Sequence, residues 1–139
     1  MSSGKGGPFG ALIVKDGKIL VRACNQVLDT KDPTMHAEVN AIRQACKQLG
    51  HFELQDCIIY SSCEPCPMCL GAIYWVRPKA LFFAADRKTA GAHGFDDDFI
   101  YKEIALPSDK RHIPTVCMQL DESEEPFICW DNKTDKVQY

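Results

Sequence analysis

The chain has 139 residues, of which 45% are hydrophobic and 25% charged, and its formal net charge is −3. This length suits one domain with a single core. The negative net charge argues against nucleic acid as the main partner, since a protein that neutralises phosphates needs a basic face. No apolar run reaches the about 20 residues of a membrane helix, and no signal peptide is visible, so a cytoplasmic, reducing location is expected.

The first half of the chain predicts a hairpin followed by a helix. Residues 8–27, PFGALIVKDGKILVRACNQV, contain two β-type runs around Asp16-Gly17, which is a strong hairpin signal. Residues 32–50, DPTMHAEVNAIRQACKQLG, predict a helix, because apolar residues recur at helical spacing and Gly50 ends the pattern.

The second half alternates apolar runs with helical patterns. Strands are expected at DCIIYSS (56–62), KALFFAA (79–85) and, as the weakest candidate, TVCMQ (115–119); helices are expected at PMCLGAIYWV (67–76), DDDFIYKEI (96–104) and SEEPFICWDNK (123–133). Strands that alternate with helices favour a layered α/β domain, with parallel pairings after the hairpin.

His36 and Glu38 stand two residues apart near the start of the first predicted helix. In the middle of a helix they would point about 200° from each other. They can share one site only in the first turn, where the helix end faces a cleft. A lone histidine at a helix start is more often a cap or a solvated residue. His36 therefore indicates a metal site only if further metal-binding residues lie near it.

Cys66 and Cys69 supply those further ligands in the stretch PCPMC. With Pro67 as the first helical residue, both thiols can face forwards from one helix end, where the helix dipole favours thiolates. Together with His36 they form a three-ligand zinc set. Catalytic zinc sites typically keep three protein ligands and leave one position for water.

Two alternatives compete with a catalytic zinc site. Cys63, three residues before Cys66, offers a fourth ligand that would close a structural site in a zinc-stabilised binding module without catalysis. Cys66 and Cys69 could also form a redox pair, but then the spacing of His36 and Glu38 would be a coincidence. Glu38 has a role only in the catalytic interpretation, as the carboxylate that moves protons for a metal-activated water.

The combined pattern H-x-E…P-C-x-x-C is the signature of zinc-dependent deaminases. The chain resembles the cytidine-deaminase-like superfamily, and within it the short bacterial guanine deaminases. The resemblance runs from residue 7 to residue 139 and rests on GGPFGALIVKDGK, DPTMHAEVNAIRQACKQLG, YSSCEPCPMCLGAIYW, GFDDDFIYKEI and the aromatic C-terminus. It implies a three-layer α/β fold, with a mixed five-stranded sheet and helices on both faces.

The resemblance also implies roles for single residues. His36, Cys66 and Cys69 would hold one Zn²⁺ per subunit, and Glu38 would shuttle protons while water attacks C2 of guanine. Substrate binding is expected from Phe9, which lines the base pocket, from Asn25, which offers both donor and acceptor, and from the backbone N–H of Ala37.

Asp97, in GFDDDF, matches an acidic residue that guanine-specific members place in the pocket. Guanine presents two donors, N1–H and the 2-amino group, on the edge that is attacked. A carboxylate there would bind this edge and could relay protons, whereas adenine has no such pair of donors. Without the resemblance, Asp96, Asp97 and Asp98 would be a solvated acidic helix start.

The resemblance further implies a homodimer. Residues 1–139 would form a single deaminase domain whose segment 121–139 is exchanged between subunits, with Tyr139 closing the pocket of its own or the partner's subunit. The superfamily usually has an N-terminal helix before GGPFG; here it is expected to be missing, which would expose apolar surface.

Two alternative substrates stay open within the deaminases. A tRNA adenosine deaminase shares the zinc motifs, although the net charge of −3 and the GFDDDF stretch argue against it. Guanosine is harder to separate from guanine, because the depth of the pocket at N9 cannot be seen in a sequence.

Overall fold

The computed structural model describes residues 6–138. The chain divides into two compact units, Met1–Tyr101 and Lys102–Tyr139. Helix α5 (Asp98–Ala105) begins in the first unit and ends in the second. All the predicted site residues except Tyr139 belong to the first unit, and Tyr139 lies outside the described residues.

The first unit is built on a mixed sheet with the strand order β2-β1-β3-β4. Its strands are β1 (Gly10–Lys15), β2 (Lys18–Cys24), β3 (Cys57–Cys63) and β4 (Ala80–Ala85). Strand β1 is antiparallel to both β2 and β3, whereas β3 and β4 are parallel. The predicted hairpin is confirmed: Asp16 and Gly17 both have positive φ, as a tight two-residue turn requires.

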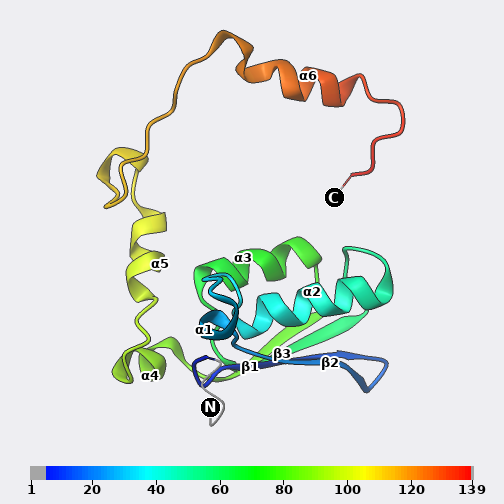
Figure 1. The fold of residues 1–139 in the computed structure, drawn as a ribbon, viewed down its shortest axis with the longest axis vertical. Helices are drawn as coiled ribbons and strands as arrows, with labels where there is room; N and C mark the ends of the chain where they lie inside the picture. Colours follow the sequence, from blue (N-terminus) through cyan, green and yellow to red (C-terminus); the bar gives the residue numbers. More distant parts are fainter. Residues whose placement is uncertain (1–5, 139) are drawn as a thin grey trace. The chain divides into compact units, whose positions relative to one another are not determined.

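Two helices, α2 (Ala37–Leu49) and α3 (Pro67–Val76), lie side by side over one face of the sheet (Figure 1). Between them and the strands lies the hydrophobic core, in which Ile13, Leu54 and Ile59 are almost completely buried. Strand β3 alternates in burial, so Ile59 and Ser61 face the helices while Tyr60 points outward, where its ring stacks on Phe82. The α/β layering expected from the sequence is therefore present.

Strand direction brings several loops to one edge of this sheet. Gly10 at the start of β1 pairs with Cys24 at the end of β2, and Cys63 at the end of β3 pairs with Ala85 at the end of β4. The segments beside these four residues therefore meet at the same edge, which also holds the first turns of α2 and α3. Ligand sites of layered α/β sheets typically lie there.

Two short helices in the first unit were not predicted. These are α1 (Val27–Thr30), directly after Asn25, and α4 (Arg87–Ala92), directly after β4. Asp86 caps α4 by accepting a hydrogen bond from the backbone N–H of Thr89 at 2.8 Å. Asp86 is the kind of residue that favours a helix start, but six residues are too few for a helical pattern to stand out.

The second unit contains two 3₁₀ turns (Ser108–Lys110 and Asp121–Glu124) and helix α6 (Glu125–Asp131), where a helical piece was expected. The strand expected at residues 115–119 was wrong, and the described residues form a sheet of four strands, not five. A strand needs a ladder partner, and no ladder of the described chain includes this segment. Val116 is 82% exposed and Met118 71%.

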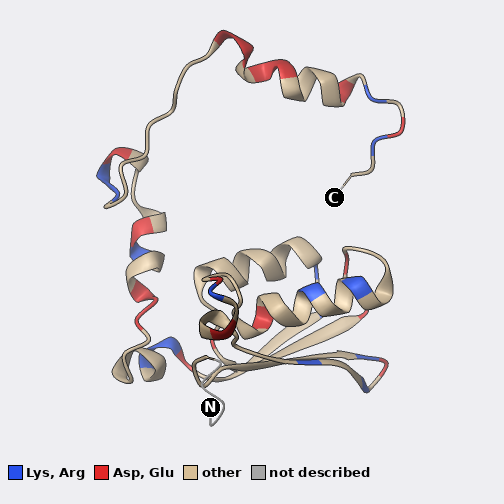
Figure 2. Cartoon of the chain, in the orientation of Figure 1, with Lys and Arg blue, Asp and Glu red and all other residues tan. Residues whose placement is uncertain are grey.

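Charge is distributed unevenly over the elements (Figure 2). Helix α3, PMCLGAIYWV, carries no charged residue, whereas the segment 121–125 carries four acidic ones. Across residues 6–138, no helix is both long enough and apolar enough to cross a membrane.

Candidate metal centre

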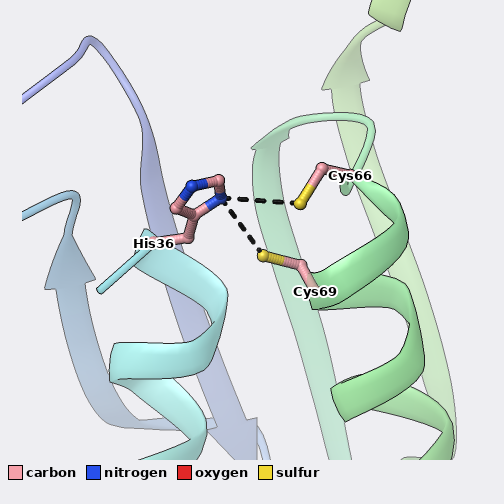
Figure 3. Close-up of side chains that lie close together, drawn as sticks. All are labelled: His36, Cys66 and Cys69. Carbon is pink, nitrogen blue, oxygen red and sulfur yellow. Dashed lines mark hydrogen bonds between the residues drawn. The ribbon is translucent and has the colours of Figure 1, made fainter. Parts of the chain in front are cut away.

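Three side chains with metal-binding atoms converge between the first turns of α2 and α3 (Figure 3). The Nδ1 atom of His36 lies 3.5 Å from the Sγ atom of Cys66 and 3.5 Å from that of Cys69. Their ligand atoms all lie within 4.8 Å of one another. The structure thus brings together the residues that were predicted to bind zinc.

Local sequence explains why the three side chains face one another. His36 and Cys66 are the capping residues of α2 and α3, both with extended backbone, and neither side chain caps its own helix. Pro67 follows Cys66 as the first residue of α3, because its fixed φ suits that position and it has no N–H to satisfy. Cys69 lies within the first turn of α3, on the same side as Cys66.

The three groups strongly affect one another's protonation. Hydrogen bonding from Cys69, and then from His36, lowers the pKa of the Cys66 thiol to about 4, although burial opposes this. Cys69 is the donor of the pair, so its pKa is raised by that bond and by burial. The pKa of His36 is raised chiefly by its hydrogen bond to Cys66. These hydrogen bonds favour the thiolate form of Cys66, which is the form that binds a metal ion.

This donor set fits zinc. Two cysteine sulfurs and one imidazole nitrogen are soft-to-borderline ligands that zinc commonly takes, and a set of three protein ligands is typical of catalytic zinc sites. Binding would release the remaining thiol proton, because zinc requires thiolates.

Glu38 lies beside the cluster in the first turn of α2 and is 5% exposed. Its Oε1 atom accepts a hydrogen bond from the Ser61 hydroxyl at 2.5 Å, and its Oε2 atom lies 3.4 Å from the Sγ atom of Cys69. One carboxylate oxygen is therefore bound to the sheet, and the other faces the cysteines.

Cys63 is turned away from the cluster. Its Sγ atom lies 3.7 Å from the carbonyl oxygen of Asp86, and burial raises the pKa of its thiol. It is absent from the group of metal-binding side chains found in the described chain. This geometry does not support a closed site in which Cys63 is the fourth ligand.

A cavity of about 620 Å³ opens beside the cluster. Its walls include His36, Cys66 and Glu38, together with the predicted substrate-binding residues Phe9 and Asn25. Ala37 is fully buried as the first residue of α2 and is not among the residues that line the cavity. The volume lies in the range of small-molecule sites.

Asn25 is held at the cavity wall, directly after β2. Its Oδ1 atom accepts a hydrogen bond from the Val27 backbone N–H at 3.2 Å, so its amide NH₂ is the group available to donate to a bound molecule. Gly6 packs against it so closely that a Cβ atom would lie 2.2 Å from Oδ1. Any larger residue at position 6 would clash with both the side chain and the backbone carbonyl of Asn25.

Asp97 contributes an acceptor to the same cavity, from the turn before α5. Among the described residues, its Oδ1 atom is buried without a hydrogen-bond partner. Burial, and then the nearby Cys66, raise the pKa of this carboxyl. A buried acceptor without a partner is costly unless a ligand supplies a donor.

Two residues of the site were missed from sequence. Phe95 packs edge-to-face on Phe9, with ring centroids 4.9 Å apart, and lines the cavity. The signal that could have identified it is its place in GFDDDF, directly before the acidic residues. Ser61, which binds Glu38, gave no signal, because the two residues are 23 positions apart in the chain.

A sequence model of the cytidine and deoxycytidylate deaminase zinc-binding region matches residues 2–85, more than half of the chain. The chain belongs to this deaminase family. Among curated relatives, it is 57% identical over 139 residues to guanine deaminase from Bacillus subtilis, covering 100% of this chain and 89% of that protein. It is 46% identical over 85 residues to a tRNA-specific adenosine deaminase from Aquifex aeolicus, covering 60% of this chain and 56% of that protein.

Solved structures of the family agree with this placement. The crystal structure of Bacillus subtilis guanine deaminase matches with a TM-score of 0.97 and 57% identity, covering 99% of this chain and 88% of that chain. The structure of NE0047 in complex with 2,6-diaminopurine matches with a TM-score of 0.66 and 31% identity, covering 69% of this chain and 55% of that chain. The deaminase fold expected from the sequence is confirmed.

Proposed function

We propose that this protein is a zinc-dependent guanine deaminase. The observation that carries the proposal is 57% identity to a guanine deaminase over the whole chain. The cluster of His36, Cys66 and Cys69 beside a cavity supports it. In the reaction, water adds to C2 of guanine, the bond between C2 and the 2-amino nitrogen breaks, and xanthine and ammonia are formed.

One zinc ion per subunit would be held by His36, Cys66 and Cys69. When bound, zinc supplies a water molecule that is activated for attack at neutral pH. The family's description as zinc-binding and the donor set both support this cofactor. The two helix ends hold the ligands, and Glu38 stands next to them.

Glu38 takes the proton that the attacking water loses and delivers a proton to the leaving amine. It is buried beside Cys69 and lines the cavity, so it can reach both groups without competing bulk water. A positioned carboxylate of this kind typically accelerates proton transfer about 10²- to 10⁴-fold.

The cavity wall orients the purine. Phe9 and Phe95 offer apolar ring surface for the base, and the Asn25 NH₂ donates to one of its acceptors. Asp97 accepts from N1–H and the 2-amino group and can relay protons there, which satisfies its buried Oδ1 atom. For the backbone N–H of Ala37 to reach a further polar edge of the base, as the resemblance implies, the first turn of α2 would have to open, because Ala37 is fully buried and does not line the cavity.

Ammonia release from purified, zinc-loaded protein tests the function directly. Guanine, guanosine, adenine and cytosine are supplied separately, and inosine formation is measured in a tRNA anticodon stem-loop. Turnover of guanine is expected, without turnover of adenine, cytosine or the RNA. If ammonia is released from guanosine but not from guanine, the substrate is the nucleoside and not the free base. If inosine formation in the RNA is the only activity, the protein is a tRNA deaminase.

Replacing Cys63 with alanine is expected to leave the zinc content unchanged, because its sulfur faces Asp86 and not the cluster. The loss of a buried side-chain atom should destabilise the fold by about 1 kcal/mol. Zinc is measured by elemental analysis, with Cys66→Ala as the matched variant that should lose the metal. Zinc loss in Cys63→Ala would instead support a closed, non-catalytic site.

The proposed functional unit is a homodimer of single deaminase domains (residues 1–139) that exchange the segment 121–139. Two surfaces support association. Helix α3 carries no charged residue (Figure 2), and on it Tyr74 is 76% exposed and Trp75 60%. Within the second unit, Phe127 of α6 is 71% exposed. Apolar patches of this kind commonly mark protein interfaces.

We assign the protein to the cytoplasm, where the free cysteines of the described chain would stay reduced.

Deleting residues 131–139 is expected to leave zinc bound but to lower kcat/KM for guanine by about 100-fold, because the pocket of the neighbouring subunit loses its closing segment. Full activity of the truncated protein would contradict the exchange. Complementation sharpens the test: the truncated chain co-assembled with full-length Glu38→Gln should regain activity, since the inactive chain still donates its C-terminal segment. The control is a Cys66→Ala partner that also lacks residues 131–139; it has no C-terminal segment to donate and should not restore activity.

A further inference from the structure

The hydroxyl of Ser61 lies deep in the first unit, against the carboxylate of Glu38. Ser61 is 6% exposed, and its Oγ atom lies 2.5 Å from Oε1 of Glu38. It occupies a central strand, paired with Ala11 of β1 on one side and Phe83 of β4 on the other. The sheet therefore fixes the backbone that carries this hydroxyl.

The direction of the hydrogen bonds can be deduced. The Cys63 backbone N–H, which can only donate, lies 3.5 Å from the Ser61 Oγ atom, so the hydroxyl accepts that bond. Its single proton then goes to Glu38, whose carboxylate accepts it on Oε1. The second oxygen, Oε2, faces the Sγ atom of Cys69 at 3.4 Å.

We propose that Ser61 is a positioning residue: its hydroxyl stays hydrogen-bonded to Oε1 of Glu38, so that Oε2 is the oxygen that receives and releases the proton. The proposal rests on the proposed deaminase function. The terminal torsion of a glutamate is broad and roughly two-fold, so packing alone does not fix the plane of its carboxylate. A hydrogen bond from a strand held on both sides does fix it.

The proton's route then has defined atoms. The attacking water gives its proton to Oε2 of Glu38, and the bond between Oε2 and this proton breaks again when the leaving amine takes it. Oε1 stays bound to Ser61 throughout. Without the hydroxyl, the carboxylate plane can rotate and Oε2 faces the reacting groups for only part of the time.

Three variants test this role. Ser61→Ala removes the hydroxyl and Ser61→Thr retains one. Ser62→Ala is the matched control, because Ser62 is exposed and its hydroxyl accepts a hydrogen bond from the backbone N–H of Gly10, not from a group of the site. Ser61→Ala should lower kcat for guanine about 10- to 100-fold, the range seen for groups that orient a metal site from its second layer. KM, zinc content and the dissociation constant of xanthine should stay close to those of the unaltered protein.

Ser61→Thr should recover most of the rate, and Ser62→Ala should retain it. A crystal structure of zinc-loaded Ser61→Ala should show the Glu38 carboxylate rotated from its orientation in the unaltered protein. An unchanged kcat and orientation in Ser61→Ala, or a loss of rate explained by zinc loss, would overturn the proposal. Failure of the unaltered protein to deaminate guanine would instead refute the proposed function, and the crystallographic comparison would still test the positioning of Glu38.

Discussion

Replacing Glu38 with glutamine is expected to lower kcat for guanine by about 100- to 10,000-fold. Glutamine has nearly the same shape and can still accept the hydrogen bond from Ser61, but its amide nitrogen cannot take up the proton that water loses. Zinc should remain bound, because His36, Cys66 and Cys69 are unaltered. Ammonia release under substrate saturation measures the effect, with zinc determined on the same sample.

Glu53→Gln is a suitable control for this variant. Glu53 is a carboxylate away from the metal centre, where it forms an ion pair with Arg77 at 2.6 Å, so its loss should leave the rate unchanged. If Glu38→Gln turns over guanine at a rate close to that of the unaltered protein with zinc in place, Glu38 is not the proton shuttle. A loss of zinc in parallel with activity would make Glu38 a support of the metal centre instead.

The parts of the fold that were predictable are those encoded by neighbouring residues. Asp16-Gly17 predicted the hairpin because both positions need positive φ. Gly50 ends α2 in the left-handed conformation, and Pro67 begins α3, each as local preference dictates. Since the candidate metal ligands stand at these two helix starts, the same local signals also predicted where the candidate ligands lie.

Contacts between distant segments could not be predicted in the same way. The bond between Ser61 and Glu38 depends on how α2 packs over the sheet, and a serine in an apolar strand carries no sign of it. The ring contact between Phe9 and Phe95 joins residues far apart in the chain. The prediction of a strand at 115–119 was wrong because it relied on local preference alone. Its residues have β propensity, but without a partner strand they form no ladder.

Replacing Asp97 with asparagine is expected to lower kcat/KM for guanine roughly 10- to 150-fold, which corresponds to about 1.5–3 kcal/mol for a hydrogen bond to a charged group. Guanine presents two donors on the attacked edge, and the buried Oδ1 atom of Asp97 has no partner within the described chain. Asparagine keeps one oxygen but replaces the other with an NH₂ group. This donor would face the donors of guanine whenever the amide is turned towards them.

Specificity should change together with rate. Adenine lacks the pair of donors that Asp97 would bind, so its inhibition constant should change far less than kcat/KM for guanine. Asp96→Asn is the matched comparison: asparagine retains the Oδ1 atom that accepts from the Asp98 backbone N–H at 3.1 Å, which preserves the turn before α5. Equal losses in both variants would show that the acidic turn acts as a structural unit, whereas a loss confined to Asp97→Asn identifies the carboxylate that selects guanine.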